Sequence, residues 1–412
     1  MSGASLEATG APRTTPPQIT GRLTTIMALA CGAIVANLYY AQPLVGPISH
    51  ALRLPVRLSG LVVTLAQLGY GAGLLLVVPL GDMLENRRLV AIILTVAGLG
   101  LAGVALSDST DTFLVASFVV GFGSVATQVL VPLAAHLAPD AQRGRVIGNV
   151  MGGLIAGIML ARPVASLVAA SFGWRTIFYA SSLAMLLLAI VLRRVLPVWQ
   201  PQLHRAGPAP HYGQILASML HMLRLRTLQR RIAYQMLAFA GFNLFWTAVP
   251  LMLASRFALT QRGIALFALA GAGGALAAPL AGRLADRGLV RPVTRAVPVL
   301  MAACFLVSRW GFDAGSLLVL GLTAILIDAC VQTNQVVSQR VIYELQPHAR
   351  GRITGVYMAL VFVGGACGSA LGSFTVAEGG WPLTALAGAG LGLLSLALVV
   401  TERSLAPHTL NT

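Results

Sequence analysis

Long apolar runs dominate this chain of 412 residues, and they decide the solvent in which it folds. Hydrophobic residues make up 57%, charged residues only 10%, and the mean hydropathy is +0.82, which a water-soluble globule of this length would not tolerate. A helix needs about 20 apolar residues to cross the hydrocarbon core of a bilayer. We therefore expect an all-α membrane protein with twelve transmembrane helices, from the runs at residues 24–46, 58–80, 88–107, 112–136, 146–170, 176–196, 231–254, 262–284, 292–310, 315–340, 353–376 and 382–401.

The formal net charge is +16, and all the basic residues that contribute to it are arginines, because the chain has no lysine. If the amino terminus lies inside, 21 of the 28 arginines fall in cytoplasmic segments, six fall on the other side, and Arg162 is left within a run. This distribution follows the positive-inside rule and disfavours nucleic-acid binding as the reason for the charge. We expect a multi-pass protein of the bacterial cytoplasmic (inner) membrane with both termini in the cytoplasm.

Motifs of enzymes and of metal sites are not found in the sequence. The four cysteines lie in apolar runs at spacings that fit no zinc site, and the seven histidines form no metal or catalytic set. A chain without lysine also has no Walker lysine with which to bind ATP. We expect neither enzymatic activity nor a cofactor.

The sequence contains a long internal repeat. Asn37–Tyr40 returns as Asn243–Trp246, 206 residues later, and Arg143–Arg145 returns as Arg350–Arg352, 207 residues later. Six helices separate the copies, so the copies are parallel repeats related by an axis along the membrane normal. The expected order is a disordered cytoplasmic amino terminus, a six-helix bundle, a cytoplasmic linker, a second six-helix bundle and a cytoplasmic tail, at residues 1–21, 22–196, 197–229, 230–402 and 403–412.

The loop at residues 282–288, GRLADRG, resembles the loop signature of the major facilitator superfamily, and the resemblance extends over essentially the whole chain. The first copy, at residues 79–88, keeps the aspartate and the arginine pair but has Val78 and Glu85 where the signature has glycines. The resemblance implies a loop that latches helices on the cytoplasmic face when the protein is open outward. The alternative is charge that sets topology and caps helices. The residues concerned are Asp82, Arg87, Arg88, Asp286 and Arg287.

Three further stretches resemble the bacterial sugar and drug efflux branch of this superfamily, whose members exchange solute for protons. Helix five keeps the glycine spacing of the antiporter signature at Gly148 and Gly157, although Arg162 precedes the proline. NLYYAQPL at 37–44 and DACVQTNQVVSQR at 328–340 are the other two. Small residues at this spacing also serve close helix packing, which is the alternative explanation of the glycines.

Polar side chains gather on the first, fourth, seventh and tenth helices, the four that line the central cavity in the superfamily fold. Each amide alone is explained by an interhelical hydrogen bond worth about 1 kcal/mol. On four repeat-related helices, a solute-lining role is favoured. Tyr40 and Trp246 offer stacking surfaces, and the scarcity of charge favours a neutral or weakly charged solute. The predicted solute-binding residues are Asn37, Tyr40, Gln42, Gln128, Asn243, Trp246, Gln332 and Gln335.

Asp328 is the one carboxylate deep within a run, and Arg162 lies at a similar depth on helix five. Burial favours the neutral acid and a nearby cation favours the carboxylate, so a site that alternates between the two environments can take up and release a proton. We predict that the two residues pair across the halves and couple proton movement to solute movement. A static pair, or an arginine bonded to backbone carbonyls, is the alternative.

The sequence thus predicts a secondary transporter that works by alternating access and exports a small organic solute, drug-like or sugar-like, in exchange for protons. The alternatives are a proton-coupled importer of a small metabolite and a transport-inactive membrane sensor or scaffold. The expected partners are the solute, protons and the lipid bilayer, with no nucleic acid. The resemblance implies a monomer.

Overall fold

The computed structural model describes residues 19–199, 211–274, 277–346 and 349–402. The disorder expected for residues 1–21 falls almost entirely on residues outside this description. Ile19 and Thr20 are described, and both are anchored: Ile19 donates its backbone N–H to Leu137 O, and the Thr20 hydroxyl accepts from Leu23 N at 3.2 Å and so caps the first helix.

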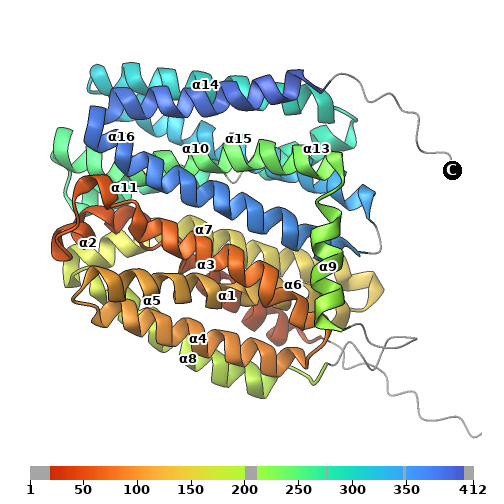
Figure 1. Ribbon diagram of the computed structural model, residues 1–412. Coiled ribbons are helices and arrows are strands. Elements are labelled where there is room, and N and C mark those ends of the chain that lie inside the picture. The colour runs from red at the N-terminus through yellow and green to blue at the C-terminus, as the bar shows by residue number, and fades with distance from the viewer. Residues whose placement is uncertain (1–18, 200–210, 275–276, 347–348, 403–412) are drawn as a thin grey trace, which may run out of the picture.

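The first half of the chain forms a bundle of helices, in red to yellow-green in Figure 1. Several of these helices are divided by short turns or 3-10 segments. In order, the elements are α1 (Gly21–Ala36), η1 (Gln42–Leu44), α2 (Val45–Ala51), η2 (Val56–Leu58), α3 (Leu61–Leu76), η3 (Val78–Asp82), α4 (Asn86–Leu106), α5 (Thr110–Gly123), η4 (Ser124–Ala126), α6 (Thr127–Leu137), η5 (Asp140–Gln142), α7 (Arg143–Phe172) and α8 (Arg175–Val195).

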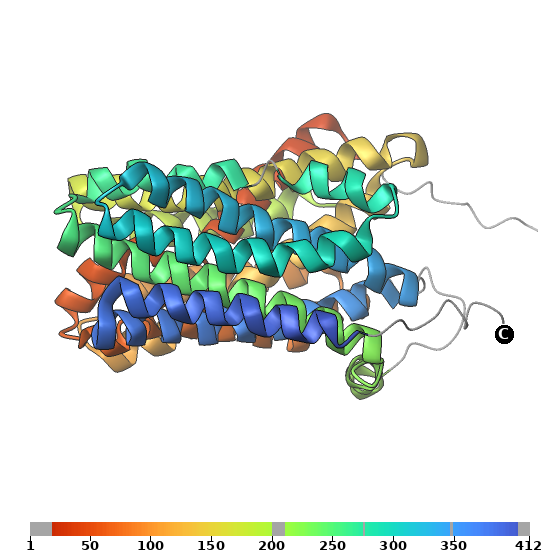
Figure 2. The ribbon, with the colours of Figure 1, turned by 90° about the horizontal axis from the view of Figure 1, so that it is seen from above.

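The second half packs beside the first and runs in the same up-and-down order (Figures 1 and 2). It follows a helix in the expected linker. The elements are α9 (Tyr212–Met222), α10 (Arg226–Arg256), α11 (Gln261–Ala268), α12 (Ala270–Gly274), α13 (Ala277–Asp286), α14 (Val290–Asp313), α15 (Leu317–Leu345) and α16 (Arg350–Val400).

Within the described residues, nine helices are long and apolar enough to cross a membrane, and they account for ten of the twelve expected runs. The helix α16 contains two runs, joined at Gly380, whose φ of 60° turns the chain back. The other two expected runs are interrupted: 24–46 is broken after Ala36, and 262–284 is divided into α11, α12 and α13. The architecture is therefore the predicted one, with irregular backbone inside two of its spans.

Glycines bring repeat-related helices into backbone contact. A Cβ on Gly157 of α7 would overlap Gly32 O of α1, and a Cβ on Gly364 of α16 would lie 2.6 Å from Met236 O of α10. The two contacts occupy matching places in the two halves. Close packing thus accounts for these glycines, as the alternative interpretation of the pattern held. Gly148 differs, because a Cβ there would meet nothing within 4 Å.

All described ends of the two halves lie at one end of the bundle, which we call the termini end; the opposite one is the far end (Figure 1). At the far end the halves are tied by Arg57, whose Nη1 lies 3.7 Å from Glu378 Oε1 and whose guanidinium lies 4.9 Å from the ring of Phe374. Ser373 Oγ also donates to Arg57 O at 3.1 Å. These contacts close the seam at the far end.

The helix α9 crosses the seam at the termini end, where Figure 1 shows it standing across the other helices. Tyr212 donates its hydroxyl to Leu76 O of the first half at 2.7 Å, and Arg352 of the second half donates to Ser218 Oγ at 3.0 Å. Ile215 and Met219 are buried against Val356. The linker therefore holds α3 and α16 together on this side of the bundle.

Candidate functional site

A break in the first span exposes backbone and amide groups in the interior of the bundle. The helix α1 ends at Ala36, and a turn leads to η1, whose Gln42 is fully buried. Non-helical backbone at membrane depth is tolerated where it lines a cavity or is buried in protein. Because of the break, the side chain of Gln42 points toward α7 and α10, where it bonds to Arg162 and Asn243.

Arg162 occupies the centre of the site and is only 3% exposed. Its Nε donates to Gln42 Oε1 at 2.7 Å. Its guanidinium lies over three aromatic rings, at 5.2 Å from the centroid of Tyr39, 4.9 Å from Phe242 and 4.3 Å from Trp246. Cation–π contacts and one amide therefore hold a charge that would be costly in an apolar bundle.

Asp328 on α15 lies opposite Arg162 and is 6% exposed. Arg162 Nη1 and Asp328 Oδ2 are 4.0 Å apart, and Trp246 Nε1 donates to Asp328 Oδ1 at 2.7 Å. The structure thus contains the ion pair between the halves that the sequence suggested. Whether this pair couples protons to solute stays a prediction.

A chain of amides continues from the ion pair and also joins the halves. Gln42 Nε2 donates to Asn243 Oδ1 at 3.0 Å, and Gln67 Nε2 donates to the same oxygen at 2.9 Å. Asn243 Nδ2 in turn donates to Phe239 O at 2.9 Å. Buried polar networks of this kind fix the relative position of the elements that carry them.

A cavity of about 60 Å³ lies against the ion pair. Polar groups line one part of it and apolar side chains line the rest, from both halves of the chain. Its lining residues are Tyr39, Ile155, Ile158, Met159, Arg162, Phe239, Phe242, Gly271, Asp328, Val331 and Gln332. Three of the predicted residues therefore meet at one cavity, namely Arg162, Asp328 and Gln332, and Gln42, Asn243 and Trp246 contact it through the network.

The remaining predicted solute-binding residues lie apart from this cavity. Asn37 accepts from Ser181 Oγ at 2.5 Å within the first half. Gln128 donates to the Tyr70 hydroxyl at 3.1 Å, and Gln335 donates to Met358 Sδ at 3.0 Å. Tyr40 is half-buried and does not line the cavity that Tyr39 lines. In this conformation they serve interhelical contacts.

The gating-loop residues make their ion pairs with unexpected partners. Arg87 Nε and Arg88 Nε bond to Glu85 at 3.0 and 2.8 Å, so within the described residues it is Glu85 that holds this arginine pair rather than Asp82. Asp286 pairs with Arg340, at the end of α15, rather than with the adjacent Arg287. Each loop is thus tied within its own half, and the latch across conformations stays a prediction.

Three site residues were missed by sequence reasoning. Gln67 lies on α3, outside the four helices considered, and its signal was a lone amide in an apolar run. Tyr39 was passed over for its neighbour Tyr40, because the break after Ala36 changes which aromatic faces inward. Phe242 carried no signal, since a phenylalanine in an apolar helix is ordinary.

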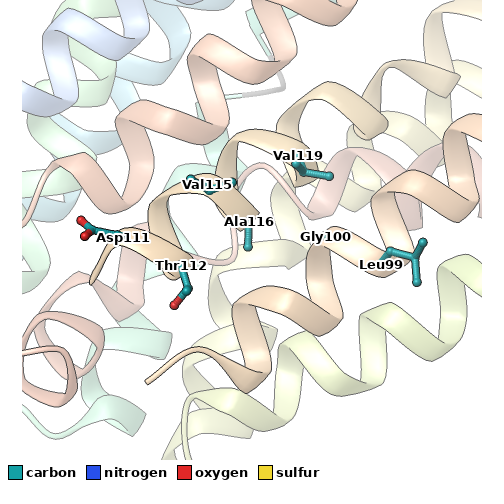
Figure 3. A pocket seen from close by; sticks show the side chains of 7 residues that line it. All are labelled: Leu99, Gly100, Asp111, Thr112, Val115, Ala116 and Val119. Atoms are coloured by element: carbon teal, nitrogen blue, oxygen red, sulfur yellow. The ribbon is translucent and has the colours of Figure 1, made fainter. Parts of the chain in front are cut away.

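A second hollow lies on the surface between α4 and α5, with a volume of about 470 Å³. Figure 3 shows its lining, which is mainly Leu99, Val115, Ala116 and Val119 with Asp111 and Thr112 at one end. These helices belong to the same half, and the hollow touches none of the residues of the buried network. Of these two hollows, the cavity at the ion pair is the candidate site because polar groups from both halves line it.

Comparison with known proteins gives the family context. Residues 25–333 and 232–411 match the model of the Major Facilitator Superfamily. An uncharacterized transporter of Escherichia coli O157:H7 is 39% identical over 381 residues, which cover 92% of this chain and 95% of that protein. A probable transporter of Streptomyces coelicolor is 32% identical over 89% of this chain and 85% of its own length. A probable sugar efflux transporter of Mannheimia succiniciproducens is 22% identical over 90% of this chain and 91% of that protein.

Solved structures share the fold. The nucleoside transporter NupG matches with a TM-score of 0.72 at 13% identity, over 92% of this chain and all of the other. The xylose transporter XylE of E. coli, in a partially occluded inward-open conformation, matches with a TM-score of 0.69 at 16% identity, over 92% and 97%. At such identities the likeness concerns the fold alone: an all-helical membrane protein.

Proposed function

Because the chain belongs to the major facilitator superfamily and is a secondary transporter rather than an enzyme, we propose that it exports a small organic solute in exchange for protons. Alternating access occurs by rocking of the two halves about the solute site. The observation that carries the proposal is the buried contact between Arg162 of the first half and Asp328 of the second. Because the pair joins the two halves that move, protonation of Asp328 changes the interaction between these halves.

Proton uptake changes the attraction between the halves. When Asp328 is ionised, its charge and that of Arg162 attract across the seam in a region of low dielectric. When Asp328 is protonated, the charge disappears and Arg162 keeps only Gln42 and the aromatic rings. The relative free energy of the two conformations then changes, which is what a bistable transporter needs of its coupling residue.

The expected orientation supports the proposed direction of transport. Arginine placement favours a cytoplasmic location for the termini end. The seam at the far end is closed by Arg57, Phe374 and Glu378, so this conformation holds the site away from the outside. The resemblance to efflux transporters supports export. In the exchange that we propose, solute and proton occupy Asp328 in turn.

Reconstituted protein tests the proposal. Purified protein is placed in liposomes with a trapped pH dye, and a panel of amino acids, sugars and drug-like cations is offered under an imposed proton gradient. We expect a transported solute to move protons in the opposite direction, and Asp328→Asn to abolish this movement while the protein still inserts and folds. Asp313→Asn is the matched control, since Asp313 pairs with Arg309 at an exposed position.

The same measurement separates the alternatives. Protons that move with the solute identify an importer, and proton-linked flux for no member of the panel favours a sensor or scaffold. Transport by Asp328→Asn at the rate of the unaltered protein contradicts the coupling role.

A further inference from the structure

The guanidinium of Arg162 has a donor to spare beside the cavity. Its Nε bonds to Gln42 and its Nη1 faces Asp328, but its buried Nη2 has no hydrogen-bond partner among the residues that the structure describes. An unsatisfied buried donor on a charged group is costly, because no hydrogen bond offsets the water that the group has lost. Arg162 also lines the cavity. A ligand with a negatively charged acceptor would satisfy this group.

The carboxylate of Asp328 has an acceptor to spare on the same cavity. Its Oδ1 accepts from Trp246, while its Oδ2 stands 4.0 Å from Arg162 Nη1, beyond normal hydrogen-bond length. Gly271 packs tightly beside this oxygen, since a Cβ there would lie 3.0 Å from Oδ2 and 2.8 Å from Trp246 Cζ2. Both Asp328 and Gly271 line the cavity. A ligand with a cationic donor would satisfy this oxygen.

An α-amino acid head group presents both charges at a matching separation. Its ammonium and carboxylate lie roughly 3–4 Å apart, so each could face one member of the Arg162–Asp328 pair. The four groups then form a ring of alternating charges, in which each charge has two opposite neighbours. A solute with one charge would leave either Arg162 or Asp328 without its complement.

The cavity also has a place for an apolar body. Its volume of about 60 Å³ accommodates a head group, given that a cavity needs about 10–15 Å³ by the same measure to hold one water molecule. Next to the charged pair, the lining is made by Ile155, Ile158, Phe239 and Phe242. Such side chains favour an apolar substituent over a polyhydroxylated one.

We propose that the solute of this site is a small zwitterion of the amino acid class. Its carboxylate binds Arg162, its ammonium binds Asp328, and its apolar side chain packs against Phe239 and Phe242. This inference rests on the proposed function and names its substrate. It also explains exchange: the ammonium and the proton compete for Asp328, so binding of the solute inside releases a proton there. The net charge of the solute is zero, in accord with the scarcity of charge around the site.

Matched probes test the proposal by calorimetric titration of the purified full-length protein. The zwitterions are phenylalanine, leucine and alanine; 3-phenylpropanoate lacks the ammonium, 2-phenylethylamine lacks the carboxylate, and glucose is a neutral polyol. We expect at least one zwitterion to bind tenfold or more tightly than all three others. Equal or tighter binding of a single-charge probe or of glucose, or binding of no zwitterion, overturns the proposal.

Single variants of the Arg162–Asp328 pair should bind a probe with one charge at least as tightly as a zwitterion. Asp328→Asn leaves Arg162 uncompensated, so 3-phenylpropanoate should bind at least as tightly as phenylalanine. Arg162→Gln leaves Asp328 uncompensated, so 2-phenylethylamine should bind at least as tightly as phenylalanine. The double variant R162Q/D328N leaves neither charge of the pair uncompensated, so it avoids this cause of misfolding, and it should lose the preference for zwitterions. A double variant that keeps this preference contradicts the assignment, and Asp313→Asn is the control that should bind as the unaltered protein does.

Failure of this inference is distinguishable from failure of the proposed function. Proton exchange driven by glucose or by an organic cation would leave the transporter and its coupling pair in place while excluding the amino acid class. Binding of phenylalanine without any proton movement would support the amino acid class while contradicting proton exchange.

Discussion

Trp246 touches both members of the buried ion pair: its Nε1 donates to Asp328 Oδ1 at 2.7 Å, and its ring lies 4.3 Å from the guanidinium of Arg162. One side chain thus serves as hydrogen-bond donor to the acid and as π surface to the base. The repeat places Tyr40 at the matching position of the first half, but Tyr40 does not line the cavity. The halves share ancestry in sequence and differ in how each contributes to the site.

Trp246→Phe is expected to slow proton-coupled transport about tenfold or more. Phenylalanine keeps an aromatic face for Arg162 but removes the donor to Asp328, and a hydrogen bond to a charged group contributes about 1.5–3 kcal/mol. Initial rates of solute-driven proton flux in liposomes provide the measurement. Trp310→Phe is the control because Trp310 is 64% exposed on the surface of the bundle; equal rates for both variants would contradict a role of the Trp246 donor.

Arg162→Ala is expected to destabilise the protein more than the double variant R162A/D328A does. Removing one partner of a buried pair leaves an uncompensated charge and costs about 3–5 kcal/mol, whereas removing both leaves none. Thermal unfolding in detergent, followed as Tm, measures the difference. A double variant with a Tm no higher than that of Arg162→Ala would indicate that the two side chains do not interact.

Arg57→Ala is expected to favour opening at the far end. The substitution removes both the ion pair with Glu378 and the contact with Phe374, so the conformation closed there loses stability. A cysteine placed at Ser369, which is fully buried beside Gly60, should react severalfold faster with a membrane-impermeant maleimide in the R57A background. Arg309→Ala is the control, since Arg309 pairs with Asp313 on its own helix. Unchanged labelling would rule out a closing role for Arg57.

Gly364→Ala is expected to lower stability by about 1–3 kcal/mol, because the added methyl group would lie 2.6 Å from Met236 O and force α16 away from α10. Gly390→Ala should have little effect, since a Cβ there meets nothing within 4 Å. Tm values of the two variants in the same detergent make the comparison. Similar losses in both would point to a backbone effect rather than to close packing.

The architecture could be predicted from the sequence because a bilayer allows few solutions. Apolar runs of about 20 residues must form helices there, and the repeat orders them into halves. The pairing of Arg162 with Asp328 followed from the same reasoning, since two isolated charges at similar depth in a bundle have few other partners. A turn between the last two runs was also implied, because two adjacent spans need one, and the structure has it at Gly380.

The finer geometry of the site depended on features that periodicity does not carry. The break after Ala36 rotates the following residues, so Tyr39 rather than Tyr40 meets Arg162. Gln67 reaches Asn243 from α3, which only the packing of the halves makes possible. Glu85 binds the arginine pair next to it, a local contact that a loop signature built around glycine at that position does not contain.

The two bonds of α9, one to Leu76 and one to Arg352, make the bundle asymmetric about its long axis. Separation of the halves at the termini end must either rupture these bonds or swing around them. Swinging leaves α3 beside α16 and widens the passage on the opposite flank, where α7 begins. A solute would then leave sideways from the axis, and shortening the chain that precedes α9 would restrict how far the flank can open.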